Sequence, residues 1–205
     1  MNKNTPAMQF TWYELMATDV ARASAFYGEL FGWAIHDQQI LADGASIGAI
    51  FPFPGGAGIG SHWVPYAVVD DLDATVACAL AAGGRTCFPP TVHPLGGRFA
   101  FLEDAQGAYF SLRSGVVATP TPFVAPKLLA DDPPKATAFY DALFGGVPGL
   151  IAARPPVAPR TMWLPRVPAF DGERAQRLGG MLVRPHVVVD PTGGVIAMPE
   201  ATDAA

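Results

Sequence analysis

The stretch Leu15-Met16-Ala17-Thr18-Asp19, followed by Ala25-Phe26-Tyr27 and Leu30-Phe31-Gly32, returns 113 residues later as Leu128-Leu129-Ala130-Asp131-Asp132, Ala138-Phe139-Tyr140 and Leu143-Phe144-Gly145. Three shorter pairs follow in the same order: Trp63-Val64-Pro65 with Trp163-Leu164-Pro165, Gly83-Gly84 with Gly179-Gly180, and Asp104-Ala105-Gln106-Gly107 with Asp190-Pro191-Thr192-Gly193. Their offsets are 100, 96 and 86 residues, so the second copy has lost 27 residues in steps of 13, 4 and 10. An ordered set of this kind indicates an internal repeat.

Each copy is expected to hold two units in which a strand leads into a helix and then into further strands. In the first unit the run from Phe10 to Ala17 favours a strand, Asp19 can cap the next helix, and Gly32 can end it. The second unit opens with a strand at 63–69, continues with a helix that stops at Gly83-Gly84, and closes with a hairpin that turns at 104–107. The sequence therefore predicts an α+β fold of tandem βαβββ modules.

The losses in the second copy predict a truncated second domain. We expect one domain over 8–114, a linker over 115–122 and a shortened domain over 123–199, with 1–7 and 200–205 disordered. The 13-residue loss falls between Gly146 and Trp163, where the first copy has room for a strand hairpin. The 10-residue loss removes the counterpart of 91–100 and is expected to delete a further strand. The apolar residues left in the second copy should pack on the first copy, or on a second subunit in a homodimer.

Composition excludes several classes of function. Half of the residues are apolar and the formal net charge is −5, with Lys and Arg scattered along the chain. A nucleic-acid-binding protein usually carries a basic stripe, and none is visible. No apolar stretch has the length of a membrane span, and no secretory signal precedes the first strand. Together with two cysteines, Cys78 and Cys87, expected as buried reduced thiols, this predicts a cytoplasmic protein.

The ordered motifs resemble those of the glyoxalase/bleomycin resistance/extradiol dioxygenase superfamily, also called the vicinal oxygen chelate superfamily. The similarity covers 8–114 well and 123–199 in eroded form. It implies that paired modules curve their sheet into an open cup that holds a small ligand. It also implies, for the enzymes of the family, a divalent metal in the cup, held by His, Gln or Glu from set positions.

At those positions this sequence carries residues that do not bind metals. The first-strand position falls on Trp12, the corresponding strand of the second unit offers Val64, and the last strand offers Ser111. The segment 44–61, which should supply the remaining ligand, contains no Asp, Glu, His or Cys. Because transition metals need several converging N, O or S donors, we expect neither a metal nor another cofactor.

Two neighbouring residues could form a displaced metal site. Glu14 shares a strand face with Trp12, and His62 shares one with Val64, each one pleat away. His62 could equally face water. Glu14 could contact a ligand as a hydrogen-bond acceptor or weak general base, or it could pair with Arg98 or Arg113.

The sequence thus predicts a metal-free protein that binds a small molecule within 8–114. The residues expected to point into the cup are Trp12, Glu14, Val64, Tyr66, Tyr109 and Ser111. Aromatic rings with one carboxylate suit a flat or amphipathic ligand that can be cationic. One alternative is a lyase, isomerase or dioxygenase of the same superfamily that uses a displaced metal or Glu14 as the base. Another is a non-catalytic interaction module with a filled cup.

Overall fold

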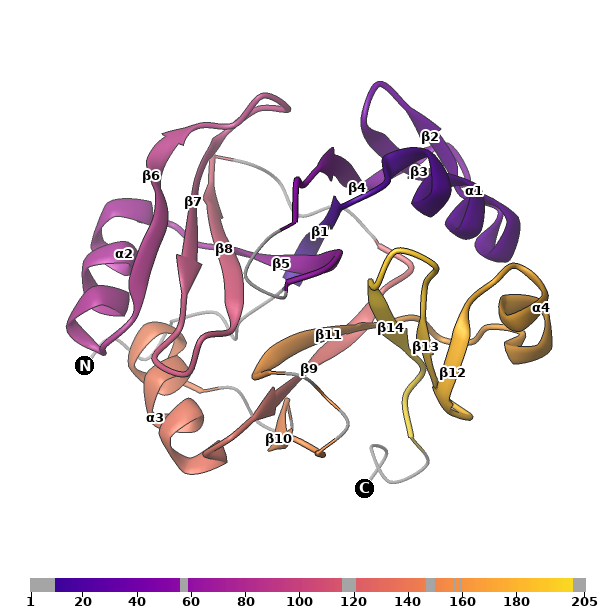
Figure 1. The fold of residues 1–205 in the computed structure, drawn as a ribbon. Helices are drawn as coiled ribbons and strands as arrows, with labels where there is room; N and C mark the ends of the chain where they lie inside the picture. The colour runs from indigo at the N-terminus through magenta and orange to yellow at the C-terminus, as the bar shows by residue number, and fades with distance from the viewer. Residues whose placement is uncertain are drawn as a thin grey trace. The chain divides into compact units, whose positions relative to one another are not determined.

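The computed structural model describes residues 10–55, 59–115, 121–146, 150–156, 158 and 160–200. The termini predicted to be disordered lie outside these ranges except for Glu200, as does the centre of the predicted linker, 116–120. Figure 1 shows the elements along the chain. They are β1 (Phe10–Ala17), α1 (Val20–Phe31), β2 (Ala34–His36), β3 (Gln39–Ala42), β4 (Ala45–Pro52), β5 (His62–Val68), α2 (Leu72–Ala81), β6 (Arg85–Val92), β7 (Arg98–Glu103), β8 (Tyr109–Ser114), β9 (Val124–Ala130), α3 (Pro133–Phe144), β10 (Ile151–Ala153), β11 (Met162–Arg166), α4 (Gly172–Arg177), β12 (Met181–Arg184), β13 (Val187–Val189) and β14 (Val195–Ala197).

The first half of the chain contains two complete βαβββ modules, as the repeat predicted. They are β1-α1-β2-β3-β4 and β5-α2-β6-β7-β8. Helix α1 begins after Asp19, whose side chain accepts a hydrogen bond from the Arg22 amide at 2.9 Å. It ends at Gly32, which has a left-handed φ of 72°. The capping and stop residues read from the sequence therefore set the ends of this helix.

The second half keeps one module whole and shortens the other. In the described part of 146–161 a single strand, β10, follows α3, and it pairs parallel with β9 as β4 pairs with β1. The hairpin made by β2 and β3 is thus the part that the 13-residue loss removed. The 10-residue loss did not delete a strand, contrary to expectation. β12 and β13 are both present with four and three residues, whereas β6 and β7 have eight and six, so the hairpin is trimmed at its turn.

The strands form two sheets. One has eight strands in the order β2-β3-β4-β1-β5-β8-β7-β6, and the other has six in the order β10-β9-β11-β14-β13-β12. The elements gather into two compact units, each of which combines a segment from both halves of the repeat. Unit 1 comprises residues 1–11, 65–119 and 125–163, and unit 2 comprises 12–64, 120–124 and 164–205.

Unit 1 is built around helices α2 and α3, which lie against each other (Figure 1). Its core joins Phe110 and Leu112 of β8 with Phe139 and Tyr140 of α3 and with Trp163. Phe139 lies so close to Gly84, at the end of α2, that a Cβ there would be 3.1 Å from its ring. The second half therefore packs on the first within this unit, as the sequence led us to expect.

Unit 2 repeats this arrangement with the other helices. Helix α1 lies against α4, which contributes Ala175 to the buried core. Gly180 follows α4 as Gly84 follows α2, and a Cβ on Gly180 would be 2.9 Å from the Phe26 ring. The Gly-Gly pairs that helped to reveal the repeat thus mark places where an aromatic ring of the other half meets the backbone.

Each unit also contains a buried hydrogen-bonded chain made from residues of the repeat. In unit 2 the Trp63 indole N–H donates to the Tyr27 hydroxyl at 3.0 Å, and that hydroxyl donates to Asp190 Oδ2 at 2.8 Å. In unit 1 the Trp163 indole N–H donates to the Tyr140 hydroxyl at 2.9 Å, and that hydroxyl donates to Asp104 Oδ2 at 2.9 Å. Burial is the main reason why the pKa of both tyrosines is raised well above its usual value. We call these two sets the Trp–Tyr–Asp chains.

Two further expectations can be compared with the fold. Among the described residues, no helix has the length and apolar character that crossing a membrane requires. Both cysteines are free thiols, but they are not both buried as predicted. Cys78 is half-buried and its thiol donates to the Ala142 carbonyl at 3.3 Å, whereas Cys87 is exposed because β6 is the edge strand of its sheet.

Candidate ligand-binding site

The predicted pocket residues of β1 lie on one face of the strand. Tyr13, Leu15 and Ala17 alternate with them, and the ring of Tyr13 stacks on Phe123 at 4.1 Å between centroids. On the other face, the Trp12 indole N–H donates to Glu14 Oε1 at 3.1 Å. Glu14 is only 5% exposed, so the carboxylate lies buried beside an aromatic ring. Val64, the third predicted residue of this unit, is also buried.

The other three predicted residues belong to unit 1. Tyr66 of β5 lies opposite Ser111 of β8 in the parallel register. Ser111 is fully buried, and its Oγ finds no hydrogen-bond partner among the described residues. Tyr109 lies two residues before Ser111 on the same face, and the Arg160 guanidinium stands 4.2 Å from the centre of its ring. The two groups of predicted residues thus belong to different units.

The structure adds two buried residues, His93 and Arg113, that the sequence did not select for this face. The His93 ring meets Tyr66 edge-on at 6.0 Å, and its Nδ1 accepts a hydrogen bond from the Leu95 amide at 3.0 Å. The single N–H proton of a neutral His93 is therefore placed on Nε2. Arg113 Nη2 donates to the carbonyls of Leu95 and Gly96 at 3.3 and 2.9 Å, so it fixes the turn that carries His93.

No periodic signal in the sequence marks His93, because it lies in a turn outside the strands. Arg113 was named only as a possible partner of Glu14, but it follows Ser111 by two residues on a predicted strand and therefore shares its face. Arg98, the other suggested partner for Glu14, instead forms an ion pair with Asp73 at 2.7 Å. That pair lowers the pKa of Asp73 through the hydrogen bond from the guanidinium.

The residues present do not fit the metal that the fold implies. Trp12, Val64 and Ser111, which the resemblance assigns to the ligand positions, lie on β1, β5 and β8. Their counterparts in the second half, offset by 113, 100 and 86 residues, are Ala125, Leu164 and Ala197, which offer no better donors. Within the ranges that the structure describes, no three residues among His, Cys, Asp and Glu are grouped so that they could hold a metal ion.

His62, the second residue of the suggested displaced site, lies at the start of β5. Its Nδ1 is 3.0 Å from the Gly60 carbonyl oxygen, and its ring meets Phe53 edge-on at 5.0 Å. If Nδ1 carries the proton, its contact with the Gly60 carbonyl is a hydrogen bond and Nε2 carries the lone pair. A metal at this place would need further donors, which the described surroundings do not gather.

Comparison with known proteins agrees with this fold of paired βαβββ modules. The Mn(II)-bound glyoxalase from Novosphingobium aromaticivorans superposes with a TM-score of 0.63 at 16% identity, over 95% of this chain and 81% of that one. BphC, a halotolerant catechol dioxygenase, superposes with a TM-score of 0.62 at 13% identity, over 95% and 87% of the two chains. At such identities the likeness concerns the fold.

The sequence places the chain in a family. The profile of the Glyoxalase/Bleomycin resistance protein/Dioxygenase superfamily matches residues 9–112, and the chain belongs to this superfamily. "Putative glyoxylase CFP32" of Mycobacterium bovis is 32% identical over 153 residues, which are 65% of this chain and 59% of that protein. The chain thus matches less than two thirds of the length of this relative.

Proposed function

We propose that this member of the superfamily binds a small molecule without using the family's metal site. The observation that carries the proposal is the replacement of metal donors by Trp12, Val64 and Ser111 at the positions that the resemblance assigns to ligands. An indole, an isopropyl group and a hydroxyl cannot hold a transition metal at the distances it requires. Side chains of these kinds are instead typical of small-molecule sites, which are mostly apolar with a few polar groups.

Two buried polar groups among the predicted site residues indicate what kind of small molecule could bind. Glu14 offers a buried carboxylate next to an indole, and Ser111 offers a buried hydroxyl that lacks a partner among the described residues. A buried hydroxyl without a partner costs free energy, which a ligand could recover by accepting or donating a hydrogen bond there. We infer a flat ligand with a polar or cationic group, bound in a cytoplasmic protein.

Metal analysis of the purified full-length chain tests the proposal. After dialysis against Mn²⁺, Fe²⁺, Ni²⁺ or Zn²⁺ and then against buffer, elemental analysis should find far less than one equivalent of any of them. Stoichiometric metal that is lost in both Glu14→Gln and His62→Ala would contradict the proposal and establish a displaced site. Proflavine, a planar cation, serves as the binding probe, and we expect its fluorescence titration to be weakened in Glu14→Gln.

An enzymatic function is the second candidate, because the relative named above is called a "Putative glyoxylase" and the similar solved structures include a glyoxalase and a dioxygenase. In this chain Glu14 would be the proton acceptor, since it is a buried carboxylate on the predicted ligand face. Turnover of a glyoxalase or catechol substrate that vanishes in Glu14→Gln would favour this reading. A third candidate is an interaction module with a filled cup, which is favoured if no probe binds.

A further inference from the structure

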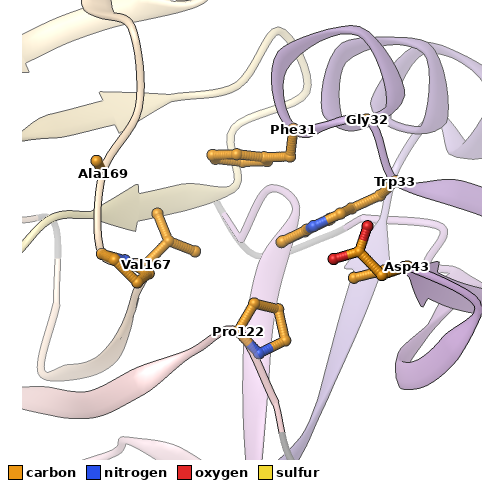
Figure 2. A pocket seen from close by; sticks show the side chains of 9 residues that line it. Phe31, Gly32, Trp33, Asp43, Pro122, Val167 and Ala169 are labelled. Atoms are coloured by element: carbon orange, nitrogen blue, oxygen red, sulfur yellow. The ribbon is translucent and has the colours of Figure 1, made fainter.

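Unit 2 contains a cavity of about 330 Å³ that none of the predicted site residues line. It lies where the end of α1, the turn between β3 and β4, Pro122 and the segment after β11 meet. Figure 2 shows the rings of Phe31 and Trp33 on one side of the space and Val167 and Pro122 on the other. Its volume is at the lower end of the roughly 300–1,000 Å³ that small-molecule sites occupy.

The aromatic wall of the cavity is held in place by other aromatic rings of the core. Trp33 stacks on Phe31 with 4.6 Å between centroids, and it also contacts Tyr27, Trp63 and Phe123 at 5.9, 6.5 and 5.4 Å. Tyr27 and Trp63 belong to the Trp–Tyr–Asp chain of this unit, which fixes their orientation. The wall is therefore formed in advance, so that a ligand need not order it on binding.

Trp33 also carries an unused hydrogen-bond donor. Of the four tryptophans, Trp12, Trp63 and Trp163 each donate their indole N–H to an oxygen atom. Trp33 makes no such bond with a described residue, although its side chain is only 6% exposed. Because Trp33 lines the cavity, a ligand there could accept a hydrogen bond from this N–H.

One charged side chain lines the cavity. Asp43 is exposed at its mouth and forms neither an ion pair nor a hydrogen bond through its side chain with a described residue. Its positive φ of 48° is explained by the Asp-Gly turn of the β3–β4 hairpin, so the backbone there is not evidence for a ligand. No lining residue is basic, so the cavity favours a cation over an anion.

We propose that this cavity is a second ligand site, separate from the predicted cup, that takes a small aromatic amine in its protonated form. The ring would lie among Phe31, Trp33 and Val167, and the ammonium group would face Asp43. Ring contacts supply most of the binding free energy, and a surface carboxylate adds a modest share. The Trp33 N–H is free to donate to an oxygen substituent on the ring.

Calorimetric titration of the full chain with 1-naphthylmethylamine tests this site, and 1-naphthoate is the anionic comparison. We expect binding of the amine to one site and little binding of the acid. Asp43→Asn should weaken the amine about threefold to fivefold at low salt, as expected for the loss of an exposed charge pair. Asn keeps the turn, because Asn-Gly is also favoured in this kind of hairpin. Asp37→Asn is the matched control, since Asp37 is an exposed aspartate with a φ of 46° that does not line the cavity.

Ala169→Trp provides the second arm, since Ala169 is an exposed lining residue whose enlargement should block the mouth. This variant should abolish binding without lowering the melting temperature. In a separate NMR titration of the unaltered chain, the indole N–H resonance of Trp33 should shift more than those of the other three tryptophans. The site would be overturned by no binding of the amine at millimolar concentration, by unchanged binding in Ala169→Trp, or by equal losses in Asp43→Asn and Asp37→Asn. Binding lost in Glu14→Gln and kept in Ala169→Trp would place the amine in the cup and would also overturn it.

Discussion

Tyr27 donates its hydroxyl proton to Asp190 at 2.8 Å, although 163 residues of chain separate them. The equivalent bond from Tyr140 to Asp104 measures 2.9 Å and spans 36 residues. In both cases the two partners come from different halves of the repeat. The same chemistry is therefore kept at two places with very different chain separations, which indicates that these bonds hold the halves together within each unit.

Removing either hydroxyl should destabilise the protein. Tyr27→Phe and Tyr140→Phe each leave a buried carboxylate oxygen and an indole N–H without their partner, at a cost of about 1–3 kcal/mol each. Urea unfolding followed by circular dichroism measures the change. Tyr13→Phe is the matched control, because the Tyr13 hydroxyl forms no hydrogen bond with a described residue and its ring is equally buried. Equal losses in all three variants would show that the hydroxyl bonds contribute little.

Asp104 should make stability depend on pH. Burial raises its pKa above the ordinary value, although the amides of Gln106 and Ala108 and the Tyr140 hydroxyl oppose this shift. The folded state then binds a proton more readily than the unfolded state, so this carboxyl contributes most stability at low pH and loses it as pH rises through the folded pKa. Relative to Asp104→Asn, the unaltered protein should gain stability as pH falls from about 6 towards 4. A difference that is constant or shrinks over this range would contradict the expectation.

Replacing Ser111 should stabilise the chain. Its hydroxyl is buried without a partner among the described residues, and Ser111→Ala removes that polar group while keeping the Cβ. We expect a gain of about 1 kcal/mol, or a melting temperature higher by about 2–4 °C. Ser114→Ala, on the same strand but partly exposed, should change little. A clear loss in Ser111→Ala would mean that the hydroxyl is satisfied, for instance by a buried water.

Glu14→Gln should affect binding more than folding. Gln has nearly the same shape as Glu and retains a side-chain oxygen that can accept the Trp12 indole N–H. We therefore expect the free energy of unfolding to change little, while the affinity for proflavine falls. A stability loss of several kcal/mol would identify Glu14 as a member of a structural ion pair.

Truncation after Ser114 should leave an unstable protein. The shortened chain loses Phe139, Tyr140 and Trp163 from the core of unit 1 and exposes Phe110 and Leu112, which pack with them. We expect aggregation, or a melting temperature far below that of the full chain. A soluble fragment that melts at the same temperature would show that residues 8–114 fold alone, as the sequence-based domain boundaries would allow.

Much of the fold could be predicted from local signals. Asp19 and Gly32 marked the ends of one helix, and the repeat assigned its counterpart and the modules. The trimmed hairpin of β12 and β13 was misjudged, because an offset counts missing residues but cannot tell a deleted strand from two shortened ones.

The sequence could not predict which residues of one half bond to which residues of the other. Self-comparison shows that Tyr27 and Tyr140 are equivalent, and likewise Asp104 and Asp190, yet it cannot tell which tyrosine meets which aspartate. Prediction of the site was limited in the same way. Strand alternation placed Glu14 and Ser111 on their faces, but it could not predict that a turn buries His93. The cavity beside Trp33 depends on segments more than 100 residues apart, for which no spacing rule exists.

The interleaving of the two units has a consequence for biosynthesis. Unit 1 draws almost wholly on the middle of the chain, so its residues have all emerged once Trp163 has left the ribosome. Unit 2 needs Asp190 and Ile196, which are made only after all residues of unit 1. Contacts between such distant parts of a chain form slowly, because a long loop must close first. The module β1-α1-β2-β3-β4 is therefore synthesised before unit 1 is complete, yet its core must wait for residues that are made after unit 1.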